Sequence, residues 1–207
     1  FEKIGVDVVA SEVFPIGSTD FRPLLARVKK TNPDIVVMSS LSIEGALLLR
    51  QSRELNLSPK IVAGTGQGFT IPNFVLAAGE SSDYVFSIDL WSPRLPYAGA
   101  QKYFDDYVLK FLSSTNYHGA QSYACIQVIA DSFKRANFMT TDGIRQALAE
   151  TYLETVFGPV RFVSDGKKTQ QNFLPTFLGQ WLSGMLEIVW PKEFASERYV
   201  YPVPNRP

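Results

Sequence analysis

The first 64 residues alternate strand and helix patterns, and this alternation restricts the fold more than any other feature of the sequence. The residue pattern predicts strands over Val6–Phe14, Asp34–Met38 and Lys60–Gly64, with amphipathic helices over Phe21–Lys30 and Ile43–Asn56 between them. Strands joined through helices by short connections form right-handed crossovers and lie parallel. The second strand is a continuous apolar run, which is typical of a strand buried on both faces. The sequence therefore predicts an α/β fold built on a parallel sheet.

The remainder of the chain changes from mostly helical to mostly strand patterns. Further helices are expected over Tyr97–Leu112, Ala120–Ala136 and Gly143–Thr151, and further strands over Tyr84–Leu90, Phe157–Phe162, Phe177–Trp181 and Met185–Trp190, the last two as a hairpin. The helix at Ala120 is apolar nearly all round, so we expect it to be deeply packed. The Pro-rich tail YPVPNRP is expected to form an extended strap on the surface.

The composition excludes several classes of protein. The chain has 207 residues with 20 basic and 20 acidic side chains, and this balance argues against a nucleic-acid-binding protein. No apolar run approaches the ~18 residues that a membrane-spanning helix needs. One cysteine, Cys125, excludes an intramolecular disulfide and a Cys-rich zinc site, and one histidine, His118, excludes a multi-histidine metal site. We therefore expect no metal and no cofactor.

The N-terminal residues resemble the end of a helix. Phe1–Gly5 reads as a last helical turn, with Gly5 at the position where a left-handed residue ends helices. We favour the interpretation that this sequence is part of a longer protein. A short N-terminal helix or a disordered end is the alternative.

A glycine loop follows the third expected strand. The segment GTGQGF places Gly64, Gly66 and Gly68 in alternate positions. A dinucleotide fingerprint would need glycine at Phe69, and a phosphate-binding P-loop would need Gly-Lys-Ser/Thr, so neither fits. Two interpretations remain: a flexible turn, or a loop whose backbone a ligand can approach, with Phe69 as an apolar wall.

A second polar loop, Ser39–Ser42, follows the second expected strand. Hydroxyls and free amides at a helix N-terminus favour an anionic group such as a carboxylate. A simple helix cap by Ser42, with Glu44 close behind, explains the same residues without a ligand. Both loops follow the carboxyl ends of adjacent parallel strands, the edge at which open α/β sheets bind ligands.

Evidence for nucleophilic catalysis is weak. The sequence has no G-x-S-x-G motif, and His118 is the single imidazole available as a base. His118 is more typical of a hydrogen-bonding loop residue, and Cys125 of a small core residue. Tyr123 is more often a core residue, although its hydroxyl could reach a cleft. We expect no catalytic residues and no enzyme.

The residues resemble a known family. The runs GSTDFRPLLARVKKTNPDIVVMSS, EGALLLRQSREL, GTGQGFTIPNF and VFSIDLW are similar to the type I periplasmic solute-binding proteins of ABC importers. The resemblance is greatest to the branched-chain (Leu/Ile/Val) amino-acid binding group. It continues through QSYACIQVIADSFKRA, GIRQALAET, FGPVRFVSDGKK and QW, so it covers nearly the whole chain.

The resemblance implies two α/β lobes that close on a ligand, of which this chain represents the C-terminal portion. Residues 1–86 would be most of the second lobe, and residues 87–156 a hinge strand and helices of the first lobe. Residues 157–207 would hold a hinge crossing, the final strands and the strap. The implied hinge residues are Asp89, Trp91, Gly158 and Pro159.

The resemblance also implies ligand-binding residues, in the two polar loops and near the start of the apolar helix. They are Ser40, Leu41, Ser42, Thr65, Gly66, Gln67, Phe69, His118 and Tyr123. The family's amino-acid binders place an acid in the glycine loop, about where Gly66 or Gln67 stands, and often an aromatic residue where Leu41 stands. Both departures weaken the case for a plain branched-chain amino acid.

The expected function is the solute-binding component of an ABC importer. It would bind an amino acid or a related small carboxylate or aromatic acid, and would deliver it to the transmembrane permease. The alternative is a ligand-sensing regulator or receptor on the same fold. We expect a periplasmic or extracellular, lipoprotein-like location and no nucleic-acid partner. The native protein is expected to be monomeric, whereas an incomplete lobe would tend to self-associate.

Overall fold

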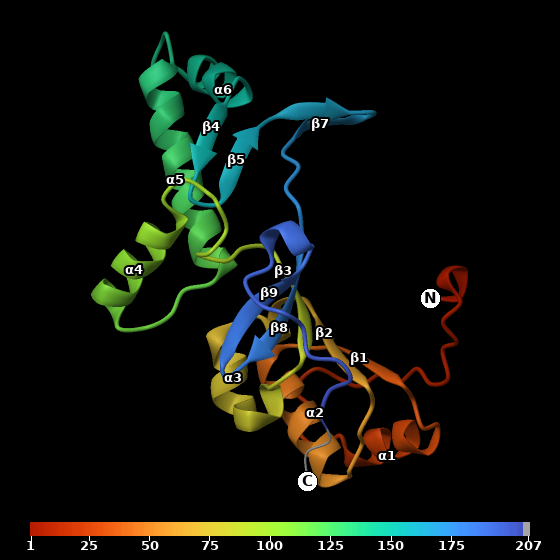
Figure 1. Ribbon diagram of the computed structural model, residues 1–207. Helices are drawn as coiled ribbons and strands as arrows, with labels where there is room; N and C mark the ends of the chain where they lie inside the picture. Colours follow the sequence, from red (N-terminus) through yellow and green to blue (C-terminus); the bar gives the residue numbers. More distant parts are fainter. Residues whose placement is uncertain (205–207) are drawn as a thin grey trace. The chain divides into compact units, whose positions relative to one another are not determined.

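The computed structural model describes residues 1–204 and divides the chain into two compact units (Figure 1). Unit 1 combines Phe1–Asp89 with the residues from Leu178 onward, and unit 2 is Leu90–Phe177. The chain therefore crosses between the units after Asp89 and after Phe177. The lobe boundaries after residues 86 and 156 that the resemblance implies stay a prediction.

Unit 1 contains a five-stranded sheet with helices on one face. Its strands lie in the order β1 (Ile35–Ser39), β2 (Ile61–Thr65), β3 (Phe86–Asp89), β8 (Phe177–Leu182) and β9 (Met185–Trp190). Its α-helices are α1 (Arg22–Lys30), α2 (Ser42–Glu54) and α3 (Pro72–Ala78), and short 3₁₀ turns are η1 (Glu2–Ile4), η2 (Gly66–Phe69), η3 (Gly79–Ser82) and η4 (Lys192–Phe194). β1, β2 and β3 are parallel, with Val36 opposite Val62. The predicted α/β fold with a parallel sheet is confirmed.

The strand predicted over Val6–Phe14 is wrong. The described structure has no strand before β1, and β1 ends the sheet on that side. The segment passes through residues 6–15 without regular hydrogen bonding and keeps several valines exposed. Alternation of side chains creates a strand only when a neighbouring strand accepts its backbone hydrogen bonds, and this segment has none.

The core of unit 1 lies between the sheet and its helices. Alternate side chains of a strand point to opposite faces, and Val36 and Met38 of β1 point toward the helices. The buried cluster on that face comprises Phe21, Leu25, Met38, Ala46, Leu48, Leu49, Phe69, Phe74, Ala78, Val85 and Trp181. Full burial of an aromatic or leucine side chain contributes about 1.5–3 kcal/mol, so this cluster is the main stabilising element of the unit.

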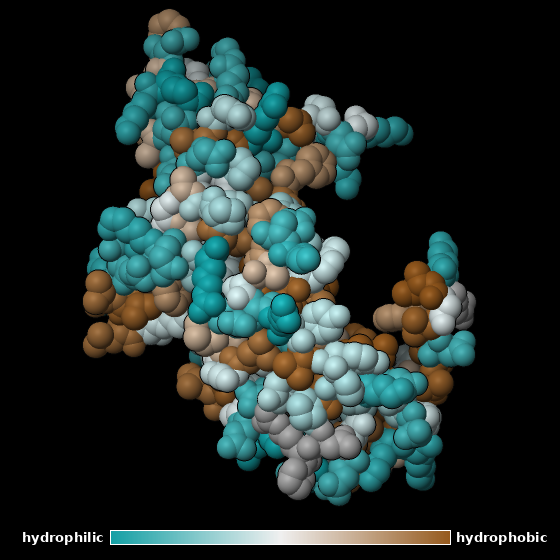
Figure 2. Space-filling view, viewed as in Figure 1, coloured by the Kyte–Doolittle hydropathy of each residue, from teal (hydrophilic) through white to brown (hydrophobic). Residues whose placement is uncertain are grey.

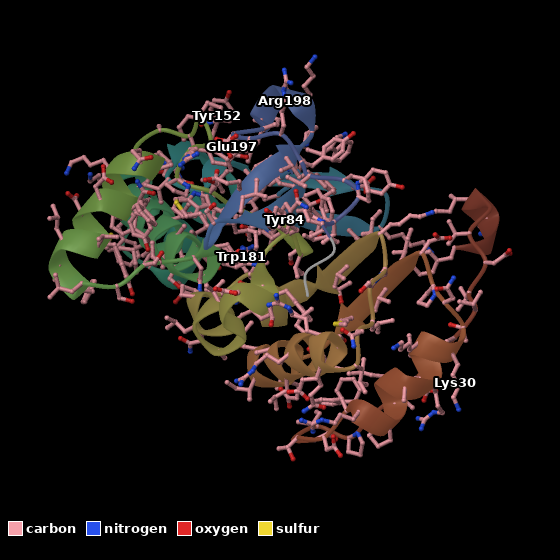
Figure 3. The ribbon with its side chains drawn as sticks, turned by 60° about the horizontal axis from the view of Figure 1, so that its bottom comes forward. Lys30, Tyr84, Tyr152, Trp181, Glu197 and Arg198 are labelled. Atoms are coloured by element: carbon pink, nitrogen blue, oxygen red, sulfur yellow. The ribbon has the colours of Figure 1, made fainter. Side chains whose placement is uncertain are left out.

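The β8–β9 hairpin joins the parallel strands through Trp181. β8 and β9 are antiparallel, and the residues between them, Ser183 and Gly184, both have positive φ (51° and 80°), as two-residue hairpin loops require. The predicted hairpin is confirmed. The Trp181 carbonyl accepts from the Tyr84 N–H at 2.7 Å, and the Trp181 N–H donates to the Val85 carbonyl at 3.0 Å. Figure 3 labels Trp181 and Tyr84 at this junction.

The buried side chain of Gln180 attaches the C-terminal tail to unit 1. Its amide nitrogen donates to the carbonyls of Tyr84 and Val200, both at 3.0 Å, and its oxygen accepts from the Val200 N–H at 2.8 Å. Further along, the Val203 N–H donates to the Lys60 carbonyl at 2.9 Å. The described part of the tail is therefore held by the Gln180 side chain at Val200 and by a backbone hydrogen bond at Val203.

Unit 2 contains three helices and two hairpins. Its elements are α4 (Ala100–Phe111), α5 (Tyr117–Arg135), α6 (Thr141–Ala149), the pair β4 (Tyr152–Thr155) and β5 (Gly158–Arg161), and the pair β6 (Val163–Asp165) and β7 (Lys168–Gln171). The Asn116 side chain caps α5 by accepting from the His118 N–H at 2.9 Å. The Trp91 indole donates to the Val156 carbonyl at 2.7 Å, which fixes the start of the unit against its β4–β5 hairpin.

The expectation that α5 is deeply packed is wrong for one of its faces. The buried face carries Tyr117, Ala120, Ala124, Val128 and Ser132. The other face exposes Tyr123, Ile126, Ile129 and Phe133. A helix that is apolar all round is buried only where neighbours cover its whole circumference. Here α6 and β4 pack against α5, and they leave that second face uncovered.

Replacement of Gln180 by leucine should loosen both the sheet junction and the tail. Gln180→Leu leaves the Tyr84 carbonyl and both backbone groups of Val200 without their partners, and buried unsatisfied groups are costly. We expect the free energy of unfolding to fall by about 2–4 kcal/mol, measured by guanidinium denaturation. The same change at the exposed helical residue Gln101 should lower the free energy of unfolding by less than about 0.5 kcal/mol. Equal effects at the two positions would contradict this account of Gln180.

Candidate ligand-binding site

The loop between β1 and α2 presents the N-terminus of α2. Leu41 is the N-cap residue, with extended backbone (φ −76°, ψ 171°) and no side-chain cap, and its carbonyl accepts from the Gly45 N–H at 2.8 Å. Ser42 is therefore the first residue of the helix, and the interpretation of Ser42 as the cap is wrong. The first-turn N–H groups of Ser42, Ile43 and Glu44 have no acceptor within the helix. Together with the helix dipole, they favour an anionic group beside Ser42.

The second loop lies beside the first. Ser39 and Thr65 are paired residues at the carboxyl ends of β1 and β2, and the Thr65 hydroxyl donates to the Met38 carbonyl at 3.5 Å. The structure thus brings Ser40, Leu41, Ser42 and Thr65 to one edge of the sheet, as the two expected strands require. The side chains at 66 and 67, the candidate positions Gly66 and Gln67, lie outside the described part of the structure.

Gly68 makes the contact between the two loops. A Cβ atom at this position would lie 2.0 Å from the carbonyl oxygen of Ser40, which is a backbone atom. No other residue can therefore occupy the position without moving the chain. Gly68 therefore serves the close packing of one loop on the other.

Phe69 supports the glycine loop from the core. Its side chain is fully buried, 5.0 Å from the ring of Phe74 between centroids. The ring fills the space above Gly64, where a Cβ atom would lie 2.0 Å from its Cγ. The Trp181 indole donates to the Phe69 carbonyl at 2.7 Å. Phe69 was expected to form an apolar wall toward the ligand, but in this structure it faces the interior and positions the loop.

Three buried hydroxyl groups near this edge have no hydrogen-bond partner in the described structure. They belong to Ser40, Thr70 and Ser87, and Ser87 pairs with Gly64 in the sheet. An unsatisfied buried hydroxyl costs about 1–3 kcal/mol, and such groups often mark a place where a water or ligand binds. Thr70 and Ser87 were not among the site residues predicted from the sequence. The sequence signal for Ser87 was a serine between the apolar residues of the segment VFSI.

Two further candidate residues lie on α5 in unit 2. His118 is exposed in the first turn, and its ring lies 4.0 Å from that of Tyr117 between centroids. Tyr123 is half exposed, with its ring 4.9 Å from that of Tyr103. They are five residues apart on the same helix, and no described contact joins their side chains to each other.

The four expected hinge residues occupy different places. Asp89 ends β3 and Trp91 is the second residue of unit 2, so both flank the first crossing of the chain. Gly158 and Pro159 belong to β5 within unit 2, away from the second crossing at Phe177. Gly158 has a φ of 108°, and the Tyr97 ring lies 3.0 Å from where its Cβ atom would be. The turn between β4 and β5 therefore explains why a glycine stands at position 158, and the second crossing of the chain does not.

The described residues contain no group of three or more His, Cys, Asp or Glu side chains that could hold a metal ion. Within the same residues, no helix has the length and apolar character to cross a bilayer. What the edge of unit 1 offers is a set of hydroxyls and backbone N–H groups beside the exposed side chain of Leu41. Such groups can bind a carboxylate and an adjoining apolar group without covalent chemistry.

Comparison with known proteins identifies the family. The model of the family described as periplasmic binding protein matches residues 1–184. The chain belongs to this family. A relative named Leu/Ile/Val-binding protein homolog 7, from Brucella melitensis, is 21% identical over 196 residues, covering 92% of this chain and 49% of its own length. The chain thus spans about half the length of the curated relatives it matches.

Solved structures show the same periplasmic binding protein fold. The branched-chain amino acid transporter substrate-binding protein LivJ from Streptococcus pneumoniae, in complex with isoleucine, matches with a TM-score of 0.72 and 22% identity, over 91% of this chain and 51% of LivJ. A solute-binding protein of an ABC transporter from R. palustris, in complex with benzoate, matches with a TM-score of 0.69 and 15% identity, over 85% and 48%. The resemblance inferred from the sequence is confirmed.

Filling the space above Gly64 should destabilise the candidate site. Gly64→Ala places a methyl group against the Phe69 ring, and overpacking of this kind costs about 1–3 kcal/mol of unfolding free energy. Phe69→Ala removes the Cγ and both Cδ atoms of the ring, which are the atoms that this methyl group would meet. We expect the double variant to be more stable than the sum of the two single changes predicts, as measured by a double-mutant cycle of chemical denaturation. Strictly additive effects would contradict the packing described for Phe69.

Proposed function

We propose that this periplasmic binding protein is the solute-binding component of an ABC importer, which captures a small carboxylate and delivers it to the permease. The ligand class is an amino acid or a related organic or aromatic acid. Lobe closure on the ligand, which the family resemblance implies, would produce the form that the permease recognises. Its place of action would be the periplasm or the outer side of the membrane.

The observation that carries this proposal is the edge of unit 1 where the β1–α2 loop and the glycine loop meet. The free N–H groups at the start of α2 favour a carboxylate, and the partnerless hydroxyls of Ser40 and Ser87 lie near the same edge. The exposed side chain of Leu41 offers apolar contact. These groups suit binding and release without bond cleavage.

The printed descriptions of the relatives support the choice of ligand class. LivJ was solved with isoleucine and the R. palustris protein with benzoate, and both molecules combine one carboxylate with an apolar body. A panel of leucine, isoleucine, valine and benzoate therefore tests the proposal. We expect at least one of them to raise the melting temperature of the protein, because a ligand that binds the folded state stabilises it by mass action. No shift from any member at millimolar concentration would count against the proposal.

A negative charge at the N-cap of α2 should raise the stability of the protein and lower its affinity for the ligand. Leu41→Asp supplies the missing side-chain cap, so the free energy of unfolding should rise by about 0.5–1 kcal/mol. The same carboxylate would repel a bound carboxylate and compete for the helix N–H groups, so affinity for the best ligand of the panel should fall roughly tenfold or more. Calorimetric titration and chemical denaturation measure the two effects.

The control places the same charge on α3. Leu76 is exposed on that helix, and Leu76→Asp should leave the affinity for the ligand unchanged. Unimpaired binding by Leu41→Asp would exclude the α2 N-terminus as the carboxylate site. It would leave the family assignment untouched.

A further inference from the structure

A cavity of about 80 Å³ lies in unit 1 between the C-terminal half of α2 and the sheet. Its apolar lining includes Val36 of β1, Val62 of β2 and Val85, the residue before β3. α2 contributes Leu49, Ser52 and Arg53, which the helical period places on one face. No described residue of the candidate ligand-binding site lines this cavity, so it is a separate space.

Ser52 brings an unpaired hydroxyl group to this cavity. The residue is 6% exposed, and its Oγ has no hydrogen-bond partner within the described structure. Serines inside helices can donate to the carbonyl four residues earlier, as Ser122 and Ser132 do to His118 and Val128, both at 2.8 Å. Ser52 makes no such bond. Because an unpaired buried hydroxyl is unfavourable, a hydrogen-bonding molecule in the cavity would be stabilising.

The charged groups at the cavity favour a neutral ligand. Arg53 supplies one positive charge, and its Nη1 donates to the Ser81 hydroxyl at 3.2 Å. Glu80 and Asp83 add two negative charges to the lining. An anion would therefore meet a net negative charge, and an ion of either sign would give up its hydration in the apolar part. A neutral molecule with one hydrogen-bonding group avoids both costs.

The volume restricts the ligand to a few atoms. An apolar cavity of about 150 Å³ holds benzene, so half that volume suits roughly three to four non-hydrogen atoms. We propose that this cavity is a second binding site, which takes a neutral short-chain alcohol such as 1-propanol. The alcohol bonds to the Ser52 hydroxyl, and its carbon chain lies against Val36, Leu49 and Val62. This site is independent of the carboxylate site proposed above.

Methyl NMR spectra of the protein titrated with 1-propanol test the site. We expect the signals of Val36, Leu49 and Val62 to shift and to saturate with a dissociation constant of about 1–10 mM, as suits so small a ligand. Leu109 and Leu112 at the end of α4 are 78% and 90% exposed, in a hydrophobic region that is brown in Figure 2. Their signals report non-specific contact with the alcohol and should not saturate. Equal shifts at all five residues, or no saturating shift in the cavity, would overturn the proposal.

Ser52→Ala distinguishes a ligand-binding hydroxyl from one that serves folding alone. The change removes a group without a partner in the described structure, so the melting temperature without alcohol should stay unchanged or rise slightly. The affinity for 1-propanol should fall about fivefold to tenfold, because the ligand loses its hydrogen bond. The matched control is Ser132→Ala, which removes an equally buried hydroxyl that bonds within α5. It should leave the affinity unchanged. Unchanged affinity in Ser52→Ala would contradict the proposed site.

Ser52→Met fills the space with a flexible apolar side chain. We expect a folded protein, with an unchanged circular dichroism spectrum, in which the cavity signals no longer saturate. Saturation at the wild-type concentration would exclude the cavity as the site.

Propionate tests the preference for a neutral ligand, because it joins a similar carbon chain to a negative charge. At the cavity signals it should bind at least about tenfold more weakly than 1-propanol, and equal affinity would overturn the assignment of ligand class. The methyl signals of Leu41 report the carboxylate site separately. A failure at either site is therefore distinguishable from a failure at the other.

Discussion

Phe69, whose ring packs in the space above Gly64, connects four parts of unit 1: the sheet, α2, the β8–β9 hairpin and the glycine loop. The ring occupies volume that any side chain at Gly64 would take, and it reaches Gly45 of α2 at the same time. Its backbone carbonyl accepts the indole hydrogen of Trp181, which ties the β8–β9 hairpin to the glycine loop. One residue, through its ring and its backbone carbonyl, therefore holds together the sheet, a helix, the hairpin and the loop that carries the candidate site. A rigid support of this kind is what a binding loop needs, because loops hold a ligand only as precisely as the scaffold beneath them allows.

The parallel sheet and the place of the polar loops could be predicted from the sequence, because both depend on local patterns. The continuous apolar run Ile35–Met38 and the crossovers around it sufficed to place the Ser39–Ser42 loop and the glycine loop after adjacent parallel strands. The roles of Ser42 and Phe69 could not be obtained in this way. Serine caps helices so often that its position next to the true cap, Leu41, is invisible in the sequence. The direction of the Phe69 ring depends on Gly64 and Gly45, and the latter is distant in the chain.

The failures at Val6–Phe14 and at α5 have a common physical cause. Both segments carry more apolar side chains than the described structure buries. A residue pattern shows which packing partners a segment is suited to, and not whether those partners are present. A strand pattern without a neighbouring strand remains extended and exposed, and an all-round apolar helix with neighbours on one side keeps an open face. The exposed residues Val13 and Ile126 are the observable result. Patterns of this kind indicate unmet packing, and they locate surfaces at which association is favourable.

The attachment of the tail at Val200 is coupled to the sheet, because the side-chain amide of Gln180 bonds to both. Gln180 binds the Val200 backbone with the same side chain that bonds the Tyr84 carbonyl beside β3. A chain end held by its own local contacts frays independently, with little cost in free energy. Here, release of the tail around Val200 exposes donors and acceptors inside the sheet. The Val200 N–H would therefore exchange its hydrogen with solvent at about the rate at which the β3–β8 junction opens.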